Sequence, residues 1–284
     1  MNRIDQPDAV RAQVCAWQRA GQRVAFVPTM GNLHAGHFSL VELARRNADR
    51  VVASIFVNPT QFGPSEDFAR YPRTLTEDAE GLNQAGCDLL FAPSVEALYP
   101  LGVAEATRVD VAGLGNILCG AHRAGHFSGV GTVLLRLFHA VPADAAVFGS
   151  KDYQQLQIVR RLVRDLLLPI DVIAGVTCRE PDGLAMSSRN QYLTPSQRAV
   201  APMLYGMLRE TAVSIQMGHP SISVLATGKQ KLCDAGFEPD YFELREAGTL
   251  APWRDEFRTG VLLVAARLGS TRLIDNVEFV LVED

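Results

Sequence analysis

Residues 1–175 of this 284-residue chain alternate short apolar runs with amphipathic segments. Runs rich in β-branched and aromatic side chains indicate strands at 23–29, 49–58, 87–93, 145–150 and 170–176. These runs are almost continuously apolar, as strands are when helices cover both faces of a parallel sheet. Strand–helix alternation of this kind predicts an α/β fold with a Rossmann-like, doubly wound parallel sheet.

The pattern changes after residue 176. A long helix is expected over 193–218, because Thr194 can act as its cap, Pro195 suits its first turn and Gln197 completes a capping box. The other expected elements are a helix over 221–235 and strands over 240–247, 260–269 and 277–284. The sequence therefore predicts two domains, a Rossmann-like domain over 1–176 and a smaller α+β domain over 177–284.

The sequence predicts a capping box at the start of two helices within residues 1–176. Thr74 followed by Glu77, and Asp152 followed by Gln155, each have the spacing of a capping box.

Composition limits the class of protein. The net charge of -4 and pI of about 5.9 argue against sequence-blind binding of nucleic acid, which depends on basic patches. The N-terminus lacks the apolar core of a signal peptide, and no apolar run approaches the roughly 18 residues of a membrane span. Five scattered cysteines without Cys-x-x-Cys spacing are typical of reduced thiols in a cytoplasmic protein.

Two histidines lie three residues apart in "VPTMGNLHAGHFSLVELA" (27–44), where the first strand gives way to a helix over about 36–48. Ligands of parallel sheets bind at the carboxyl ends of strands, and helix N-termini attract anions. His34 and His37 are therefore candidate donors to phosphate oxygens. The same pattern is also compatible with partly buried turn residues or with a fragment of a metal site.

Two further segments have side chains suited to phosphates. In "FGSKDYQQL" (148–156), Lys151 suits a phosphate, Asp152 a ribose hydroxyl and Gln155 a polar substrate, although Asp152 and Gln155 also fit a helix cap. The turn "GLAMSSRNQYL" (183–193) offers two hydroxyls and a guanidinium to triphosphate oxygens, or is an ordinary polar loop.

Neutral and basic side chains follow two other elements. Asn58 and Gln61 offer amides that read hydroxyls and carboxylates, or they are turn residues. Arg123 and His126 lie just ahead of a helix, as an anion-binding corner or a capping segment. The chain has no P-loop motif, which argues against a P-loop fold. It also has no Gly-x-Gly-x-x-Gly after its first strand, which argues against a dinucleotide-dependent oxidoreductase.

Seven segments together resemble one family. "PTMGNLHAGH", "SIFVNPTQF", "YPRTL", "GHFSGVGTV", "FGSKDYQQL", "GLAMSSRNQYL" and "RLIDN" occur in the order found in the pantothenate synthetase (pantoate–β-alanine ligase) family. His34 to His37 resembles the HIGH element of the wider nucleotidyltransferase superfamily, and Met186 to Arg189 resembles its KMSKS loop. Ser150 departs from the family pattern, in which Glu is common.

The resemblance implies an ATP-dependent condensation of pantoate with β-alanine through a pantoyl adenylate, with release of pyrophosphate and AMP. It also implies Mg²⁺ bound with ATP, and a cytoplasmic homodimer. It implies catalytic roles for His37, His34 and Lys151. It assigns ATP to Met30, Gly31, His34, His37, Gly149, Lys151, Asp152, Cys178, Met186, Ser187, Ser188 and Arg189. It assigns the organic substrates to Gln61, Gln155, Asn58, Arg123 and His126, and it identifies no metal ligand.

Three other functions remain open on the residues alone. One is a cytidylyl- or adenylyltransferase for a phosphorylated substrate, which would need a further cationic patch. Another is a nucleotide-binding regulator without turnover, and the third is an RNA-linked synthetase, which the acidic charge opposes. The polar segment "FGPSEDFARYPR" (62–73) is expected to act as a lid.

Overall fold

The computed structural model describes residues 1–63 and 67–281, and it divides the chain into two compact units. The first unit contains Met1–Ser150 and Ile158–Val176. The second contains Lys151–Gln157 and the chain from Thr177 on. Part of the expected lid, residues 64–66, lies outside the described residues.

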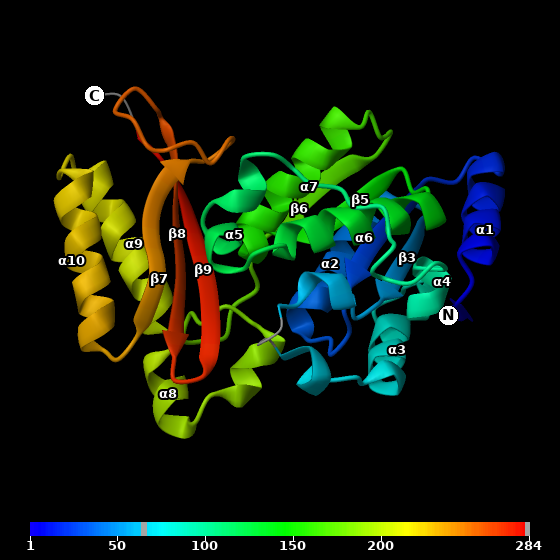
Figure 1. The fold of residues 1–284 in the computed structure, drawn as a ribbon, viewed down its shortest axis with the longest axis horizontal. Coiled ribbons are helices and arrows are strands. Elements are labelled where there is room, and N and C mark those ends of the chain that lie inside the picture. The colour runs from blue at the N-terminus through cyan, green and yellow to red at the C-terminus, as the bar shows by residue number, and fades with distance from the viewer. Residues whose placement is uncertain (64–66, 282–284) are drawn as a thin grey trace. The chain divides into compact units, whose positions relative to one another are not determined.

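The first unit is built on a six-stranded sheet in the order β1-β4-β3-β2-β5-β6, in which every pair is parallel. The predicted α/β class with a Rossmann-like parallel sheet is confirmed (Figure 1). Its strands are β1 (Asn2–Ile4), β2 (Val24–Thr29), β3 (Arg50–Ile55), β4 (Leu89–Phe91), β5 (Ala145–Gly149) and β6 (Asp171–Gly175). The edge strand β1 was not predicted, because three residues give too short a pattern.

Helices and 3-10 turns connect these strands. They are α1 (Pro7–Arg19), α2 (Ala35–Asn47), η1 (Pro59–Gln61), η2 (Asp67–Arg70), α3 (Leu75–Gln84), α4 (Val95–Leu98), η3 (Leu114–Asn116), α5 (Cys119–His122), α6 (His126–Ala140), η4 (Ser150–Asp152) and α7 (Tyr153–Asp165). The start of α7 belongs to the second unit and its remainder to the first.

Alternation along β2 shows how both faces of the sheet are buried. Ala25 and Val27 pack in one core cluster with apolar residues of α2 and α3. Phe26 points to the other face, where Phe138 of α6 meets both Phe26 and Phe148 edge-on with ring centroids 6.4 Å apart. Burial on both faces explains why the strands read as continuous apolar runs.

The strand order reverses between β2 and β5. From β2 the chain continues outward to β3 and β4, whereas β5 is followed by β6 on the opposite side. Open α/β sheets bind ligands at the carboxyl ends of the strands at such a switch point. The segments that follow Thr29 and Gly149 therefore occupy the position where a ligand site is expected.

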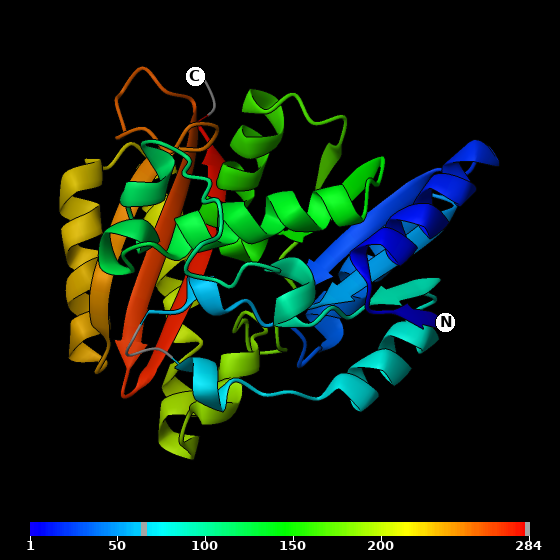
Figure 2. The same cartoon turned by 45° about the vertical axis from the view of Figure 1, so that its right-hand side comes forward.

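The second unit has an antiparallel sheet of β7 (Glu238–Glu246), β8 (Thr259–Leu268) and β9 (Thr271–Val280). Two helices, α9 (Met203–Gln216) and α10 (Ser221–Asp234), lie along one face of this sheet (Figures 1 and 2). The expected strand over 277–284 begins six residues earlier than predicted, and residues 282–284 lie outside the described residues.

The helix expected over 193–218 is interrupted. It forms α8 (Pro195–Val200) and α9, which begins at Met203, and a 3-10 turn, η5 (Ser188–Tyr192), precedes them. Pro202 has no N–H for the carbonyl of Arg198, and its ring clashes with a continuing helix, so the chain turns there. The predicted cap is confirmed, because Thr194 and Gln197 form a capping box.

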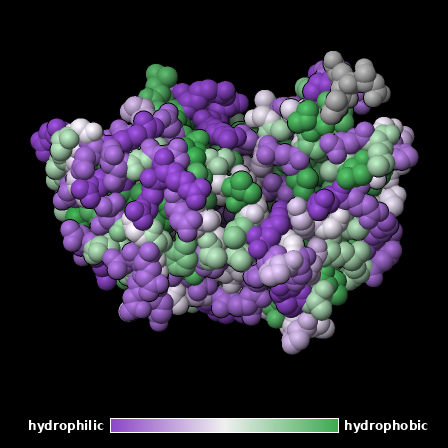
Figure 3. Space-filling view, turned by 180° about the vertical axis from the view of Figure 1, so that it is seen from behind, coloured by the Kyte–Doolittle hydropathy of each residue, from purple (hydrophilic) through white to green (hydrophobic). Residues whose placement is uncertain are grey.

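No helix of the described residues is long and apolar enough to span a membrane. The face seen in Figure 3 is mostly hydrophilic, with hydrophobic residues in small separate patches.

Candidate functional site

The two histidines form a capping box at the start of α2. Nδ1 of His34 accepts from the Gly36 amide at 3.2 Å, and the His34 amide donates to Nδ1 of His37 at 3.3 Å. The two rings lie 4.2 Å apart with an interplanar angle of 50°. Both residues are partly exposed.

This hydrogen-bond pattern assigns the tautomer of both neutral rings. Because each Nδ1 accepts a backbone N–H, each proton lies on Nε2, and each Nε2–H is a donor. The helix end also adds a positive partial charge, so the start of α2 suits an anion. Among residues 1–63 and 67–281, no group of three or more His, Cys, Asp or Glu side chains is arranged to hold a metal ion.

The turn before His34 is held by Asp78 of α3. The Asp78 carboxylate is 3% exposed and accepts from the Asn32 amide at 2.8 Å and the Leu33 amide at 2.7 Å. Gly31 and Asn32 both have positive φ, at 85° and 51°. A Cβ on Gly31 would lie 3.0 Å from an Asp78 oxygen, so glycine permits this close approach.

The capping box predicted from Thr74 and Glu77 is wrong. Thr74 makes no side-chain cap, and its hydroxyl instead donates to Asp78 at 3.1 Å. Sequence reasoning missed Asp78. The signal was present, because Asp78 shares a helical face with the apolar residues Leu75 and Leu82, where an unpaired carboxylate would be costly.

Gln61 lies at the end of η1 and is held by Asn58. Asn58 is 1% exposed, and its Nδ2 donates to Oε1 of Gln61 and to the carbonyl of Gly129, both at 3.2 Å. Its Oδ1 accepts from the Tyr99 hydroxyl at 2.9 Å and from the Thr60 hydroxyl at 3.0 Å. Protein groups therefore occupy both the donors and the acceptor of the Asn58 amide.

The remaining contacts of Gln61 involve three other predicted residues. Its Nε2 lies 2.8 Å from Sδ of Met30, in the segment after β2. Its backbone carbonyl is 2.8 Å from Nδ1 of His126 and 3.5 Å from a guanidinium nitrogen of Arg123. Arg123 is also 2.8 Å from Nε2 of His126. Because arginine only donates, His126 accepts at Nε2 and donates from Nδ1 to Gln61.

The segment after β5 carries Lys151 into the second unit. Gly149 ends β5, and Lys151 lies in η4 with its ammonium 3.8 Å from the Asp152 carboxylate. The Lys151 side chain is 20% exposed. Asp152 ends the 3-10 turn just before α7 begins at Tyr153, and Gln155 is half-buried. The capping box expected from Asp152 and Gln155 stays a prediction.

The hydroxyl–guanidinium turn follows a tight hairpin in the second unit. The Met186 amide donates to the Cys178 carbonyl at 3.0 Å, which closes the hairpin. Ser187 then caps η5, because its Oγ accepts from the Arg189 amide at 3.2 Å. Met186, Ser187, Ser188 and Arg189 are all partly exposed.

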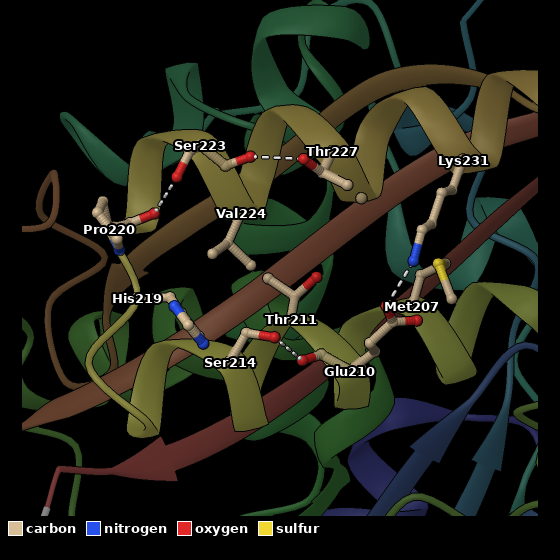
Figure 4. Close-up of a pocket in the computed structure, with 11 residues that line it drawn as sticks. Met207, Glu210, Thr211, Ser214, His219, Pro220, Ser223, Val224, Thr227 and Lys231 are labelled. Carbon is tan, nitrogen blue, oxygen red and sulfur yellow. Dashed lines mark hydrogen bonds and ion pairs between the residues drawn. The ribbon is translucent and has the colours of Figure 1, made fainter.

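A separate pocket of about 210 Å³ lies between α9 and α10 (Figure 4). Glu210 and Lys231 form an ion pair of 2.5 Å across it, and His219 lies at its other end. None of the predicted site residues lines this pocket. This pocket is therefore a different site from the predicted one, and its two charged side chains are already paired with each other.

The parallel sheet with a histidine-capped helix after β2 defines a Rossmann-like α/β protein, joined here to an antiparallel α+β unit. Comparison with known proteins specifies the family. The family model described as pantoate-beta-alanine ligase matches residues 2–278. The chain is 53% identical to the pantothenate synthetase of Pseudomonas savastanoi pv. phaseolicola over 278 residues, which covers 98% of each protein.

Solved structures agree with this. The crystal structure of pantothenate synthetase from Thermus thermophilus has a TM-score of 0.91 and 47% identity, covering 98% of this chain and 99% of that one. The pantoate-beta-alanine ligase of Francisella tularensis, solved with beta-gamma ATP and β-alanine, has a TM-score of 0.82 and 33% identity, covering 98% and 97%. The chain therefore belongs to the pantoate–β-alanine ligase family, whose members are enzymes that join pantoate to β-alanine.

Proposed function

We propose that this enzyme activates pantoate with ATP as a pantoyl adenylate, and that β-alanine then displaces AMP to give pantothenate. Family membership supports the condensation, and the related Francisella tularensis ligase was solved with an ATP compound and β-alanine. The observation that carries the proposal is the histidine capping box, which presents two Nε2–H donors at the positive end of α2.

In the first step the pantoate carboxylate attacks the α-phosphorus of ATP, and pyrophosphate leaves. Negative charge builds on the phosphoryl oxygens, and preorganised donors stabilise such charge most effectively. We assign this role to His34 and His37 in the first unit, whose Nε2–H groups would donate to these oxygens. In the second unit we assign phosphate contacts to Lys151 and to Ser187, Ser188 and Arg189.

The remaining ATP contacts are proposed from the same resemblance. Met30 and Gly31 precede the histidine pair, and Gly149 and Asp152 flank Lys151 on the ribose side. Cys178 and Met186 are joined by a backbone hydrogen bond at the base of the hydroxyl–guanidinium turn.

Gln61 and Gln155 are proposed to bind pantoate through neutral amides. The fully engaged amide of Asn58 supports a different role from the one expected, namely that Asn58 positions Gln61. Arg123 and His126 both donate to the backbone carbonyl of Gln61, so we assign them the same supporting role. A neutral ligand set suits a hydroxy acid better than a phosphorylated substrate.

Mg²⁺ is proposed to accompany ATP. This ion keeps several waters and binds through substrate phosphates, so it needs no all-protein cage. The lack of a three-ligand cluster in the described ranges 1–63 and 67–281 fits an ion carried by the triphosphate. When bound, Mg²⁺ would neutralise phosphate charge.

We also propose a cytoplasmic homodimer. All five cysteines are free thiols, which supports a reducing compartment.

Oxygen transfer tests the adenylate directly. Pantoate labelled with ¹⁸O in its carboxylate should place one labelled oxygen in AMP, because the acyl–oxygen bond breaks when β-alanine attacks. Mass spectrometry of AMP and of the pantothenate amide reads both products. Formation of ADP, or of AMP without label, would exclude the pantoyl adenylate. Pyrophosphate released in a single turnover without β-alanine should equal the enzyme added.

A further inference from the structure

The "RLIDN" segment, used above only for its resemblance, carries two adjacent buried polar residues of β9. Asp275 is 4% exposed and Asn276 is 8% exposed. Consecutive side chains of a strand point to opposite faces of its sheet. The two residues therefore lie on different faces of the sheet. Asn276 is hydrogen-bonded to Lys151, which the proposed function assigns to phosphate, and Asp275 is hydrogen-bonded to the hairpin that precedes the Ser187–Arg189 turn.

Asp275 holds the hairpin that leads to the hydroxyl–guanidinium turn. Two guanidinium nitrogens of Arg179 donate to its two oxygens at 2.6 and 3.0 Å. Arg179 also donates to the Gly183 carbonyl at 3.1 Å and lies 3.5 Å from the centre of the Tyr205 ring. This forked geometry fixes both the position and the orientation of the arginine.

Arg179 in turn fixes the hairpin backbone. It pairs with Ala185 across the hairpin, and the Glu180 amide donates to the Leu184 carbonyl at 2.8 Å. Asn190, at the far side of the turn, donates from Nδ2 to the Ala185 carbonyl at 3.1 Å. The backbone that enters the Ser187–Arg189 turn is thus tied to β9 through one ion pair.

Asn276 holds the other phosphate segment. Its Nδ2 donates to the backbone carbonyl of Lys151 at 2.9 Å. Glu278, on the same face of β9, accepts from the Tyr153 hydroxyl, whose oxygen also lies 2.9 Å from the Ala247 carbonyl. The 3-10 turn η4 is therefore held to β9 at Lys151, and the start of α7 is held to it at Tyr153. The hydrogen bond to the Lys151 carbonyl fixes the direction in which the Lys151 side chain leaves the backbone.

We propose that Asp275 and Asn276 are positioning residues, through which β9 holds Lys151 and the Ser187–Arg189 turn in one fixed arrangement for triphosphate. This inference rests on the proposed function of those two segments. All of the contacts lie within the second unit. Displacing a catalytic donor by about 1 Å can reduce the rate roughly 10²-fold, so a rigid common support has a large effect on turnover.

The test compares Asn276→Asp and Asp275→Asn with a matched control, Asp240→Asn. Asn276→Asp keeps the shape of the side chain but replaces the N–H that faces the Lys151 carbonyl with an oxygen. Asp240 on β7 pairs with Arg272 on β9 at 2.7 Å, and both side chains are mostly buried at 19% and 15% exposure. Arg272 is the second residue of β9, and its pair with Asp240 joins β9 to β7.

Four quantities are measured for each variant: kcat, KM for pantoate, Kd for a non-hydrolysable ATP analogue, and Tm. We expect Asn276→Asp and Asp275→Asn to lower kcat about tenfold or more and to raise the analogue Kd several-fold, with KM for pantoate changed less than about twofold. Asp240→Asn should lower Tm by a similar amount and leave kcat and the analogue Kd within about twofold.

A double substitution shows whether Asn276 acts through Lys151. If it does, Asn276→Ala should lower kcat in the wild-type background and have little further effect in a Lys151→Ala background. Asn276→Ala also replaces Asn276→Asp if the latter fails to fold.

Two results would overturn the inference: additive effects in the double variant, or kcat and analogue Kd values that match those of the Asp240→Asn control. An inactive wild-type enzyme would instead refute the proposed function, and the analogue Kd still reads the positioning effect in that case.

Discussion

His34 and His37 form a capping box made of imidazoles. His34 takes the place of the usual Ser or Thr at the cap, and His37 takes the place of the usual Glu at the third helical position. A glutamate at the third helical position would place a negative charge where an anionic ligand is to bind. An imidazole satisfies the same backbone amide through Nδ1 without that charge, and it keeps Nε2–H as a donor. One pair of residues therefore caps the helix and prepares its end for phosphate.

Substitution of His37 separates these two tasks. His37→Ala should lower kcat by about 10²–10³, the usual loss for a preorganised donor. It should also lower the free energy of unfolding by about 0.5–2 kcal/mol through the lost cap. His37→Glu restores an acceptor for the His34 amide but places a carboxylate beside the phosphates. Its Tm should therefore match or exceed that of His37→Ala, with a lower kcat.

Lys151→Ala provides the comparison in the second unit. Among the residues that the structure describes, the Lys151 ammonium has one ion-pair contact, 3.8 Å from the exposed Asp152 carboxylate, so its loss should hardly change Tm. The kcat of Lys151→Ala should fall by about 10²–10³. Steady-state kinetics and thermal melts of both variants check these values. Turnover near that of the wild type in either variant would remove that residue from the proposed machinery.

Cys87 is expected to be chemically silent in the folded protein. Burial raises the pKa of its thiol to about 11, despite hydrogen bonds that favour the thiolate. At pH 8 only about one thiol in a thousand would be ionised, and the thiolate is the reactive form. Mass spectrometry after maleimide treatment should show rapid labelling of the exposed Cys233 and labelling of Cys87 only after unfolding. Rapid labelling of Cys87 in the native protein would contradict its burial.

At the scale of elements, α3 supports the start of α2 through one carboxylate. Asp78 accepts both amides of the turn that precedes His34, and Gly31 allows the approach. Asp78→Asn replaces one accepting oxygen by an N–H₂ group that faces a backbone N–H. We expect it to lower the free energy of unfolding by about 1–3 kcal/mol and kcat by about tenfold or more.

Asp88→Asn is the control for Asp78→Asn. Asp88 also accepts a backbone amide, that of Val51 at 2.8 Å, and pairs with Arg50 at 2.8 Å. It lies at the opposite, amino end of β3. Chemical denaturation should show comparable losses in both variants, whereas only Asp78→Asn should lose turnover. Equal losses of kcat would mean that Asp78 acts through global stability alone.

The elements most visible in the sequence were those buried on two faces. Each of the five apolar runs contains a strand, and β2, β3, β4 and β5 are buried along almost their whole length. The ends of helices were harder to predict where one residue determines them. Pro202, for example, interrupts the helix expected over 193–218. In the site, the strand-end segments could be identified from local motifs. Their supports could not, because Asp78 and Asp275 bond to residues 45 and 96 positions away.

At the scale of the whole molecule, sheet order determines which chain segments can share a ligand. Because β2 and β5 are neighbours in a parallel sheet, the segments after Thr29 and Gly149 leave the same edge of that sheet. Rossmann-like topology therefore accounts for two distant motifs at one end of the first unit. The same sheet leaves two edge strands, β1 and β6, whose backbone groups need protection from unwanted pairing.

The proposed homodimer can be tested at the β6 edge. β1 has only three residues, a short edge of the kind that resists association, whereas β6 has five and is followed by Val176, which is 88% exposed. Leu167, just before β6, is also 88% exposed. Antiparallel pairing of two β6 strands about a two-fold axis would pair the exposed edge of each strand and cover these side chains.

Light scattering tests the dimer, and it should give twice the chain mass of 30.9 kDa. The double substitution Leu167→Asp with Val176→Asp should shift that mass to the monomer, whereas Leu101→Asp, at a 79% exposed position away from this edge, should not. A monomeric wild type would refute the dimer, and a double variant that remains dimeric would place the interface elsewhere.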